Sequence, residues 1–167
     1  MNRALFLDRD GVINEDYGYV HRIEDFHFRE GIFDVCRAAQ KERMKIVIVS
    51  NQAGIGRGLY TQEAFHAITH FMVEEFSLRS LFISGVYYCP FHPDHGIGHF
   101  KKNSFYRKPN PGMLLSACAE HNINPRLSVM IGDRDTDRQA AASAGIFSYI
   151  DASRHDWANN ALQALQS

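Results

Sequence analysis

The sequence predicts an α/β fold, with a parallel sheet of about five strands and helices on both of its faces. The first observation behind this prediction is that short, unbroken apolar runs alternate with amphipathic segments along the chain. Unbroken runs are typical of strands buried on both faces. The second is that four runs end in a polar residue, and ligands bind at the carboxyl ends of parallel strands. These residues are Asp8, Ser50, Asp133 and Asp151.

Each element follows from a local pattern. The apolar runs predict strands over residues 4–7, 45–49, 85–89, 128–132 and 147–150. Apolar residues at helical spacing predict helices over residues 31–43, 61–78, 111–121 and 135–144. Thr61 is a good N-cap, Pro111 suits a first helical turn, and Gly145 follows the last helix. We therefore expect one Rossmann-like domain over residues 1–167, with no room for a large cap domain.

Composition limits the compartment and the partners. The chain has a net charge of −1, which does not provide the strongly basic face that nucleic-acid binding requires. The apolar run at the N-terminus is too short for a signal peptide or a membrane span. Cys36, Cys89 and Cys118 lie far apart without a CxxC pair, which favours a reducing compartment. We expect a cytoplasmic monomer that binds neither nucleic acid nor membrane.

The segment FLDRDGVIN places two carboxylates after the first predicted strand. Asp8 is a candidate nucleophile, because a carboxylate that attacks phosphorus forms an aspartyl phosphate and divides one hard displacement into two. Asp10 is then the candidate general acid and base. Taken alone, this motif is short, and it equally fits a solvated acidic turn.

A second acidic segment, MIGDRDTD, supplies candidate metal ligands. Mg²⁺ prefers oxygen ligands and keeps several waters, so the carboxylates of Asp8 and Asp133 with the backbone carbonyl of Asp10 would suffice. Asp137 lies one helical turn further on and is a candidate for support of these ligands. The alternative is that Asp133 only caps the following helix.

Two further segments indicate phosphate binding. In VIVSNQAGIGRG, Ser50 can donate its hydroxyl, and we expect the backbone N–H groups of Asn51 and Gln52 to face the crevice. The glycines that follow equally fit a flexible turn. In YRKPNPG, Lys108 would neutralise charge on the transferring phosphoryl group, and Arg107 would bind a second phosphate or a hydroxyl. A basic pair in a loop is otherwise common at solvent-exposed positions.

These motifs stand in the order found in the haloacid dehalogenase (HAD) superfamily of phosphotransferases. More narrowly, the chain resembles the D-glycero-D-manno-heptose 1,7-bisphosphate phosphatase and histidinol-phosphatase family over about residues 3–150. The segments that carry the resemblance are FLDRDGVIN, GYV, SNQAGIGRG, YYCP, RKPNPGM and GDRDTDRQAA. It implies catalytic roles for Asp8, Asp10, Ser50 and Lys108. It also implies that residues of three segments contact the substrate, namely Asp16, Tyr17, Gly18, Tyr19, Arg107 and Arg134.

The same family carries a structural zinc in the loop before RKP, in a pattern like C-x-H…C-x-C. This sequence keeps Cys89 but has Phe91, Ser104 and Tyr106 at the other ligand positions. We therefore expect no structural zinc, and a cluster of Phe91, Phe105 and Tyr106 that fixes the loop by aromatic packing. The alternative is a substitute zinc site, whose ligands would be Cys89, His92, His95 and His99.

The resemblance implies a Mg²⁺-dependent phosphomonoesterase that acts on a small phosphorylated sugar, with heptose 1,7-bisphosphate losing its 7-phosphate. Histidinol phosphate is the alternative substrate. A different class, the phosphoryl-receiving switch, shares the layout but lacks a second carboxylate at the position of Asp10. A nucleic-acid 3′-phosphatase is disfavoured by the near-neutral charge. A catalytically inactive scaffold is disfavoured because all four motifs are present.

Overall fold

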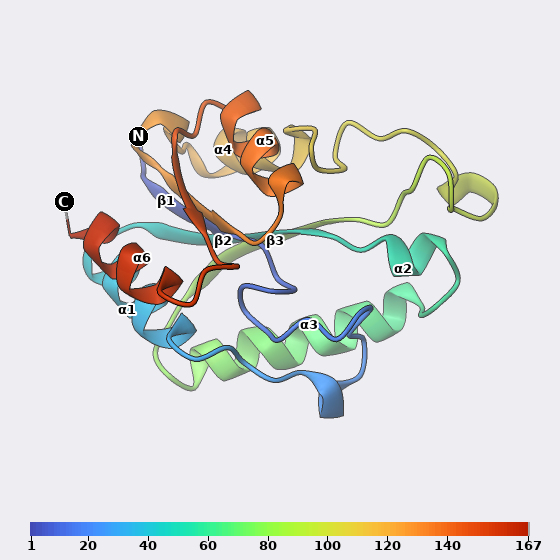
Figure 1. The fold of residues 1–167 in the computed structure, drawn as a ribbon, viewed down its shortest axis with the longest axis horizontal. Coiled ribbons are helices and arrows are strands. Elements are labelled where there is room, and N and C mark those ends of the chain that lie inside the picture. The colour runs from blue at the N-terminus through green and yellow to red at the C-terminus, as the bar shows by residue number, and fades with distance from the viewer. Residues whose placement is uncertain (167) are drawn as a thin grey trace.

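The computed structural model describes residues 1–166 and contains one parallel sheet of five strands (Figure 1). The strands are β1 (Ala4–Leu7), β2 (Lys45–Asn51), β3 (Ile83–Cys89), β4 (Val129–Gly132) and β5 (Ser148–Asp151). Their order in the sheet is β3-β2-β1-β4-β5. Leu7 pairs with Ile48 of β2 on one side and with Ile131 of β4 on the other. The central strand β1 therefore places Asp8 and its successors between the ends of β2 and β4.

Helices cover both faces of this sheet, as the sequence predicts. Helices α4 (Gly112–His121) and α5 (Asp135–Ser143) lie on one face, whereas α1 (Ile32–Lys41), α3 (Gln62–Ser77) and α6 (Trp157–Leu165) lie on the other (Figure 1). A short helix, α2 (Ala53–Gly56), follows β2. Three single 3₁₀ turns complete the helical elements of residues 1–166, at Ile23–Asp25, Gly98–Phe100 and Pro125–Leu127. No large cap domain interrupts the sheet in this part of the chain.

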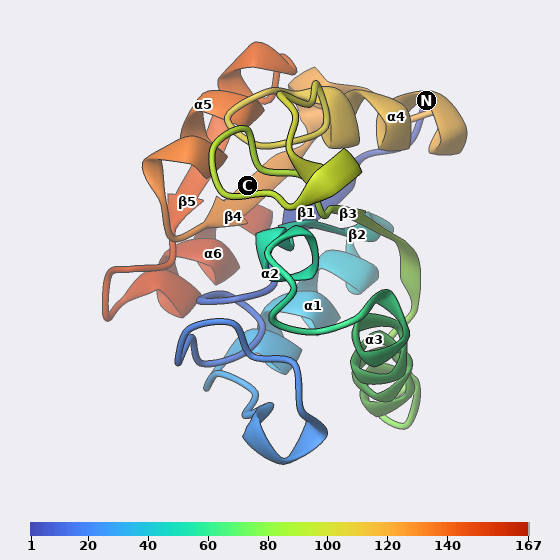
Figure 2. The same cartoon turned by 90° about the vertical axis from the view of Figure 1, so that its right-hand side faces the viewer.

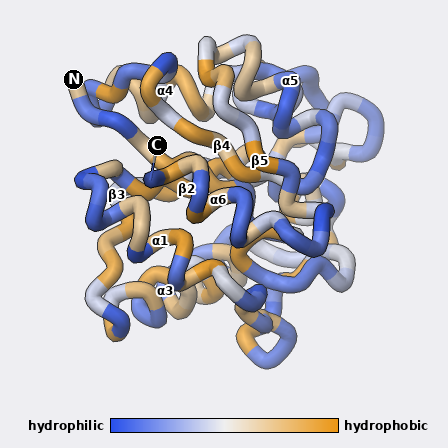
Figure 3. The backbone as a smooth tube through the Cα atoms, turned by 60° about the vertical axis from the view of Figure 1, so that its left-hand side comes forward, coloured by the Kyte–Doolittle hydropathy of each residue, from blue (hydrophilic) through white to orange (hydrophobic). Residues whose placement is uncertain are grey.

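The core consists of two apolar layers separated by the sheet. Leu5 and Leu7 of β1 are fully buried in the layer with α1, α3 and α6, whereas Phe6 is fully buried in the layer with α4 and α5. Successive side chains of a strand point to opposite faces, so an unbroken apolar run supplies both layers. Figure 3 shows this pattern, with hydrophobic colour along the strands and hydrophilic colour along the outer loops.

The predicted elements differ from the observed ones mainly at the edges of the sheet. We expected every strand to be buried on both faces, but β3 is half-buried over Ile83–Tyr88 and β5 begins at the exposed Ser148. These are the two edge strands, which have a neighbour on one side only. Thr61 caps α3 as predicted, by accepting a hydrogen bond from the Ala64 N–H at 3.1 Å. Pro111 precedes α4 as its N-cap and does not occupy the first helical turn.

Helices α2 and α6 were not predicted. Ser167, the last residue of the predicted single domain, lies outside the described residues. No helix in residues 1–166 combines the length and the apolar character needed to cross a membrane.

Candidate active site

A cavity of about 490 Å³ lies at the carboxyl ends of β1, β2 and β4. Figure 2 views the molecule from this side, with α2 and the loop after β3 in front of the strand ends. The cavity is lined by Asp8 and Asp10 after β1, by residues that follow β2, and by Lys108. Its volume lies within the range of about 300–1,000 Å³ that is usual for small-molecule sites. Of the four predicted strand-end residues, Asp8 lines the cavity and Asp133 lies close to Asp8. The buried Ser50 and Asp151, which bonds Ser153, are not among the lining residues.

Lys108 lies at the floor of the cavity between two carboxylates. Its Nζ is 2.8 Å from Oδ1 of Asp8 and 2.6 Å from Oδ1 of Asp137, and it donates to the Val49 carbonyl at 2.9 Å. Its side chain is 3% exposed. Burial alone lowers the pKa of Lys108, but the charges of Asp8 and Asp137 raise it above its ordinary value. The ammonium group therefore stays charged beside the candidate nucleophile.

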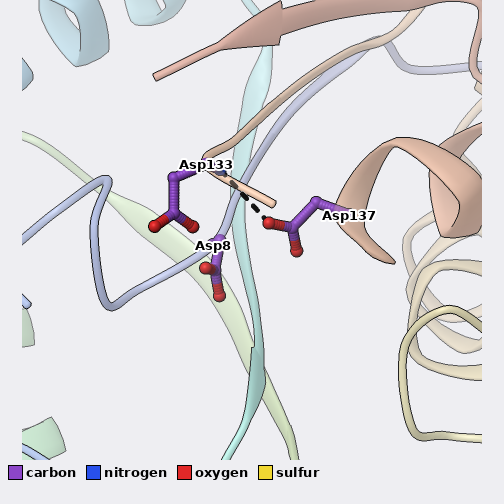
Figure 4. Close-up of side chains that lie close together, drawn as sticks. All are labelled: Asp8, Asp133 and Asp137. Atoms are coloured by element: carbon purple, nitrogen blue, oxygen red, sulfur yellow. Dashed lines mark hydrogen bonds between the residues drawn. The ribbon is translucent and has the colours of Figure 1, made fainter. Parts of the chain in front are cut away.

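Asp8, Asp133 and Asp137 form the only group of three or more potential metal-ligating side chains found in residues 1–166. Each offers an oxygen, and these oxygens lie within 4.8 Å of one another (Figure 4). Burial raises the pKa of Asp8, against the opposing charge of Lys108, and the Asp137 charge raises it further. Burial and the Asp137 charge also raise the pKa of Asp133. Three closely spaced carboxylates thus face a single ammonium group.

This donor set fits a divalent cation with oxygen ligands. Oδ1 of Asp133 is buried and accepts no hydrogen bond from the described residues. Such an atom is costly unless a cation or water satisfies it. Asp137, in contrast, is fully engaged, because its Oδ2 accepts from the backbone N–H groups of Asp133 and Arg134 at 3.2 and 3.1 Å. Figure 4 shows the first of these bonds as a dashed line. Asp137 therefore orients Asp133 and Lys108, and Asp8 and Asp133 are the better candidate ligands.

Asp10 is held by a dense set of donors. Its Oδ1 accepts from Arg9 Nε at 3.2 Å, from Arg9 Nη2 at 2.7 Å and from Asn14 Nδ2 at 3.0 Å. Its Oδ2 accepts from Gln52 Nε2 at 3.0 Å. We call the segment of residues 9–30, between β1 and α1, the flap. Arg9 is 2% exposed, so this ion pair lies beneath the surface of the flap. The backbone carbonyl of Asp10 remains a predicted metal ligand.

The residues at the end of β2 and directly after it use their polar groups differently from our expectation. Asn51 holds Lys108, because its side-chain amide donates to the Lys108 carbonyl and accepts from the Lys108 N–H, both at 3.0 Å. The backbone N–H of Gln52 donates to the Cys89 carbonyl at 2.8 Å. We expected this N–H to face the crevice. That expectation is wrong, because the N–H is already bonded to the last residue of β3. Ser50 is 1% exposed and accepts from Gln52 Nε2 at 2.8 Å.

The flap brings three of its four predicted contact residues to the cavity. Asp16, Gly18 and Tyr19 line it, whereas Tyr17 is 62% exposed and bonds His27 with its hydroxyl group at 3.1 Å. Asp16 pairs with Arg134 at 3.1 Å. The Tyr19 hydroxyl accepts a hydrogen bond from Arg57 in α2's C-cap. These contacts connect the flap to both α2 and α5.

Arginines and a histidine surround the outer part of the cavity. Arg57, Arg107 and Arg134 line it, and Arg107 Nη1 donates weakly to the Phe91 carbonyl at 3.4 Å. His92 also lines it, and its Nδ1 accepts from the backbone N–H groups of Asp94 and His95, both at 3.1 Å. Burial lowers the pKa of His92, and the Arg107 charge lowers it further. The sequence indicated Arg57 as a charge near the bound phosphate, but it did not single out His92 as a cavity residue, because the role of His92 depends on how the loop after β3 folds back over the strands.

The loop after β3 does not gather the four alternative zinc ligands. Cys89 is buried at the end of β3, and neither it nor the three histidines belongs to a metal-ligating group in residues 1–166. The predicted aromatic cluster is wrong in its members. Phe105 and Tyr106 are 57% and 49% exposed, and Phe91 instead lies 6.0 Å from Phe100 between ring centroids. Lys102 lies 4.0 Å from the centre of the Phe91 ring, which completes the packing of this loop.

Fold and site together define a phosphatase of the HAD superfamily, and a HAD-hydrolase-like family model matches residues 105–150. A D-glycero-alpha-D-manno-heptose-1,7-bisphosphate 7-phosphatase of Burkholderia mallei is 48% identical over 145 residues, which cover 87% of this chain and 77% of the relative. A D-glycero-beta-D-manno-heptose-1,7-bisphosphate 7-phosphatase of Vibrio cholerae is 48% identical over 143 residues, which cover 86% of this chain and 77% of the relative. The chain belongs to this family of heptose bisphosphate phosphatases.

A solved structure supports the same fold. The D,D-heptose 1,7-bisphosphate phosphatase from B. bronchiseptica, complexed with magnesium and phosphate, superposes with a TM-score of 0.83 at 24% identity. The match covers 98% of each chain.

Proposed function

We propose that the chain hydrolyses the 7-phosphate of D-glycero-D-manno-heptose 1,7-bisphosphate and releases the heptose 1-phosphate. The observation that carries this proposal is the buried Asp8–Lys108 pair beside Asp10 and Asp133, in a cavity whose outer part holds three arginines. The two relatives above act on opposite anomers by name, so both the α and the β bisphosphate are candidate substrates. Histidinol phosphate is disfavoured because it has no second phosphate for the arginines to bind.

In the first step, an oxygen of the Asp8 carboxylate attacks phosphorus, and the bond from phosphorus to the sugar oxygen breaks. The product is an aspartyl phosphate, and Lys108 and the Ser50 hydroxyl would neutralise and bind the transferring phosphoryl oxygens. Asp8, Asp133 and the Asp10 carbonyl would hold Mg²⁺, which when bound screens the repulsion between carboxylate and phosphate.

The leaving sugar oxygen needs a proton, which we assign to Oδ2 of Asp10. Oδ1 already accepts three hydrogen bonds, whereas Oδ2 accepts one. In the second step, a water oxygen bonds to phosphorus as Oδ2 takes a proton from that water, and the bond between phosphorus and Asp8 breaks. The enzyme returns to its starting state with inorganic phosphate and the alcohol as products.

The second phosphate would bind to Arg107 and Arg134. Both line the cavity away from its floor, and the guanidinium group suits forked contacts with phosphate oxygens. Asp16, which pairs with Arg134, would hold that side chain in place and contact sugar hydroxyls together with Gly18 and Tyr19.

The test is phosphate release from the α and β heptose bisphosphates, with histidinol phosphate as the comparison and Asp8→Asn as the inactive control. We expect kcat/KM for one or both bisphosphates to exceed that for histidinol phosphate by about 100-fold or more, the scale of an interaction lost at a site built for it. Equal turnover of all three substrates would contradict the assigned specificity. A stable phosphoprotein without turnover would instead favour a phosphoryl-receiving switch.

Three further parts of the proposal concern the state of the protein. We propose that the protein is cytoplasmic, because its three cysteines are unpaired in the structure, which suits a reducing compartment. We also propose that it is a monomer. We also propose that the loop after β3 holds no zinc, since Phe91 and Ser104 replace ligands and both are engaged in packing or hydrogen bonds. Metal analysis of protein purified without chelator tests the last point, and one zinc per chain would overturn it.

A further inference from the structure

The proposed function leaves unexplained what directs the reactive oxygen of Asp10 toward the substrate. Oδ1 is fixed by Arg9 and Asn14, so the carboxyl group can still pivot about that anchor. The Oδ2 atom has one donor in the described residues, Gln52 Nε2 at 3.0 Å. Gln52 is 2% exposed, and it comes from the segment after β2, not from the flap that carries Asp10.

The amide of Gln52 has one orientation that satisfies all its neighbours. The ionised Asp10 carboxylate can only accept, and in the acid form the proton on Oδ2 is directed at the leaving oxygen, so the amide nitrogen faces Oδ2 in both forms. The same nitrogen donates to Ser50 Oγ at 2.8 Å. The amide oxygen then faces Tyr60, whose hydroxyl group donates to it. A rotated amide would instead set its oxygen against Oδ2 of Asp10, two acceptors with no hydrogen between them, and the bond to Oδ2 would be lost, which is costly.

Tyr60 is itself firmly held. It is 9% exposed and packs in a small apolar cluster with Ile55 and Phe65. The His21 ring of the flap stacks on the Tyr60 ring with centroids 4.9 Å apart and planes inclined by 5°. Burial raises the pKa of the Tyr60 phenol, so its hydroxyl group keeps the proton that it donates.

We infer that Gln52 and Tyr60 are positioning residues for the acid–base step, with Tyr60 fixing the Gln52 amide and Gln52 fixing Oδ2 of Asp10. This inference rests on the proposed phosphatase function and adds two residues to its chemistry. The proton moves from Oδ2 to the ester oxygen as the phosphorus–oxygen bond breaks, and later from water to Oδ2. Neither Gln52 nor Tyr60 gains or loses a proton in either step.

The experiment compares two substrates in single turnover, with enzyme in excess. Release of an alkyl alcohol from the heptose bisphosphate requires protonation of the leaving oxygen, whereas p-nitrophenolate leaves without it. For Tyr60→Phe, which keeps the ring stack, we expect leaving-group release from the bisphosphate to slow by about 3- to 10-fold, the scale of one hydrogen bond. For Gln52→Ala we expect leaving-group release from the bisphosphate to slow by about 10- to 100-fold. Release of p-nitrophenolate from p-nitrophenyl phosphate should change less than about twofold in Tyr60→Phe. In Gln52→Ala, which also loses the bond to Ser50, it should slow clearly less than release from the bisphosphate.

Tyr88→Phe is the matched control, because Tyr88 packs against the same cluster and no hydrogen bond of its hydroxyl group is seen in residues 1–166. It should leave both rates unchanged. The inference is wrong if Tyr60→Phe behaves like Tyr88→Phe, or if both substrates slow equally, which would indicate general distortion of the phosphate site. If the wild-type chain hydrolyses p-nitrophenyl phosphate but not the bisphosphate, the proposed substrate is wrong. An alkyl phosphate that the chain does hydrolyse then replaces the bisphosphate in the same comparison of variants. A wild-type chain inactive on all these esters overturns the proposed function and this inference with it.

Discussion

A buried lysine is stable only where its charge is compensated, and Lys108 meets that condition from three directions. Asp8 and Asp137 balance its charge, and the Val49 carbonyl accepts its third hydrogen bond. A lysine has three N–H donors, so this set satisfies it completely. The main chain at the same residue is fixed by the side chain of Asn51. The position of the ammonium group therefore depends on β1, β2 and α5 together. None of these bonds comes from the residues at the family's zinc-ligand positions.

Asn51→Ala should reduce activity through Lys108. The change removes both bonds to the Lys108 main chain, so we expect the free energy of unfolding to fall by about 1–3 kcal/mol. We expect kcat to fall by roughly tenfold while KM changes less than about twofold, since a positioned cation acts mainly on the transition state. Steady-state kinetics and urea unfolding measure the two effects.

Asn110→Ala is the control for this prediction. Asn110 lies in the same loop, but its side chain donates to the Ser104 carbonyl and does not contact Lys108. It should leave kcat unchanged. A rise in KM without a fall in kcat for Asn51→Ala would show that the Asn51 side chain contacts the substrate directly and would contradict this prediction.

The residues found from sequence were those whose chemistry is evident from their type and their place at a strand end. Asp8 and Asp133 belong to this class, and the structure brings them together. Lys108, which a loop supplies, was found from its type and motif and pairs with Asp8. Gln52 was chosen for its backbone, yet its side chain makes the contacts that matter. Its role could not be predicted, because it depends on Tyr60, which is eight positions away and carries no motif of its own.

At the scale of elements, the turn from β1 into the flap determines where Asp10 lies relative to Asp133. Gly11 has a φ of +87°, and a Cβ placed on it would lie 2.1 Å from Oδ2 of Asp133. Gly11→Ala therefore combines backbone strain with a clash against a candidate metal ligand. We expect activity to fall by about 100-fold or more, the effect of a displacement of about 1 Å in a catalytic group.

Gly145→Ala separates strain from the clash in this prediction. Gly145 has a φ of +83°, but its nearest contact to an added Cβ would be Pro125 Cγ at 3.8 Å. This variant should lose stability while kcat stays near the wild-type value. Equal activity of Gly11→Ala and wild type in a phosphate-release assay would contradict the packing of the flap against Asp133.

The flap is also tied to the C-terminal segment that contains α6. Arg29 donates to the Gly11 carbonyl and, at 2.8 Å, to the Ala152 carbonyl, and its guanidinium lies 5.1 Å from the centre of the Trp157 ring. We expect Arg29→Met to lower the free energy of unfolding by about 1–3 kcal/mol, because two carbonyl acceptors and a cation–π contact are lost. Arg22→Met, which removes only exposed ion pairs, should change it by less than about 1 kcal/mol. Thermal or urea unfolding that ranks the two variants in the reverse order would contradict this.

Helix α6 escaped prediction although its sequence carries a signal. Trp157, Ala161 and Leu165 are buried at spacings of four residues, which is the pattern of one helical face. Helix α2 offers no such signal, because its four residues include two glycines. Its existence depends on the chain reversing direction after β2 to meet the flap and the loop after β3. The half-burial of β3 and β5 likewise depends on strand order, which the apolar runs do not specify.

At the scale of the whole molecule, the near-neutral net charge conceals a strong local separation. The floor of the cavity gathers three carboxylates against one ammonium group, while the arginines lie further out. Such an arrangement favours a divalent cation at the floor and an anionic substrate that reaches from the floor to the outer arginines. Because the opposite charges are separated only locally, the net charge of the chain could not reveal the site.

The metal should therefore stabilise the folded chain by relieving this repulsion. At a free Mg²⁺ concentration about 100 times its dissociation constant, binding to the native state alone adds ~2.7 kcal/mol, which corresponds to a rise in Tm of ~5–10 °C for a chain of this size. Asp133→Asn should abolish most of that rise. Asp151→Asn, at the end of β5 outside the cluster, should retain it, because the side-chain hydrogen bonds of the Asp151 carboxylate seen in residues 1–166 are both to Ser153. The measurement is thermal unfolding in EDTA and in a Mg²⁺ series, and a rise of equal size in Asp133→Asn and wild type would place the cation elsewhere.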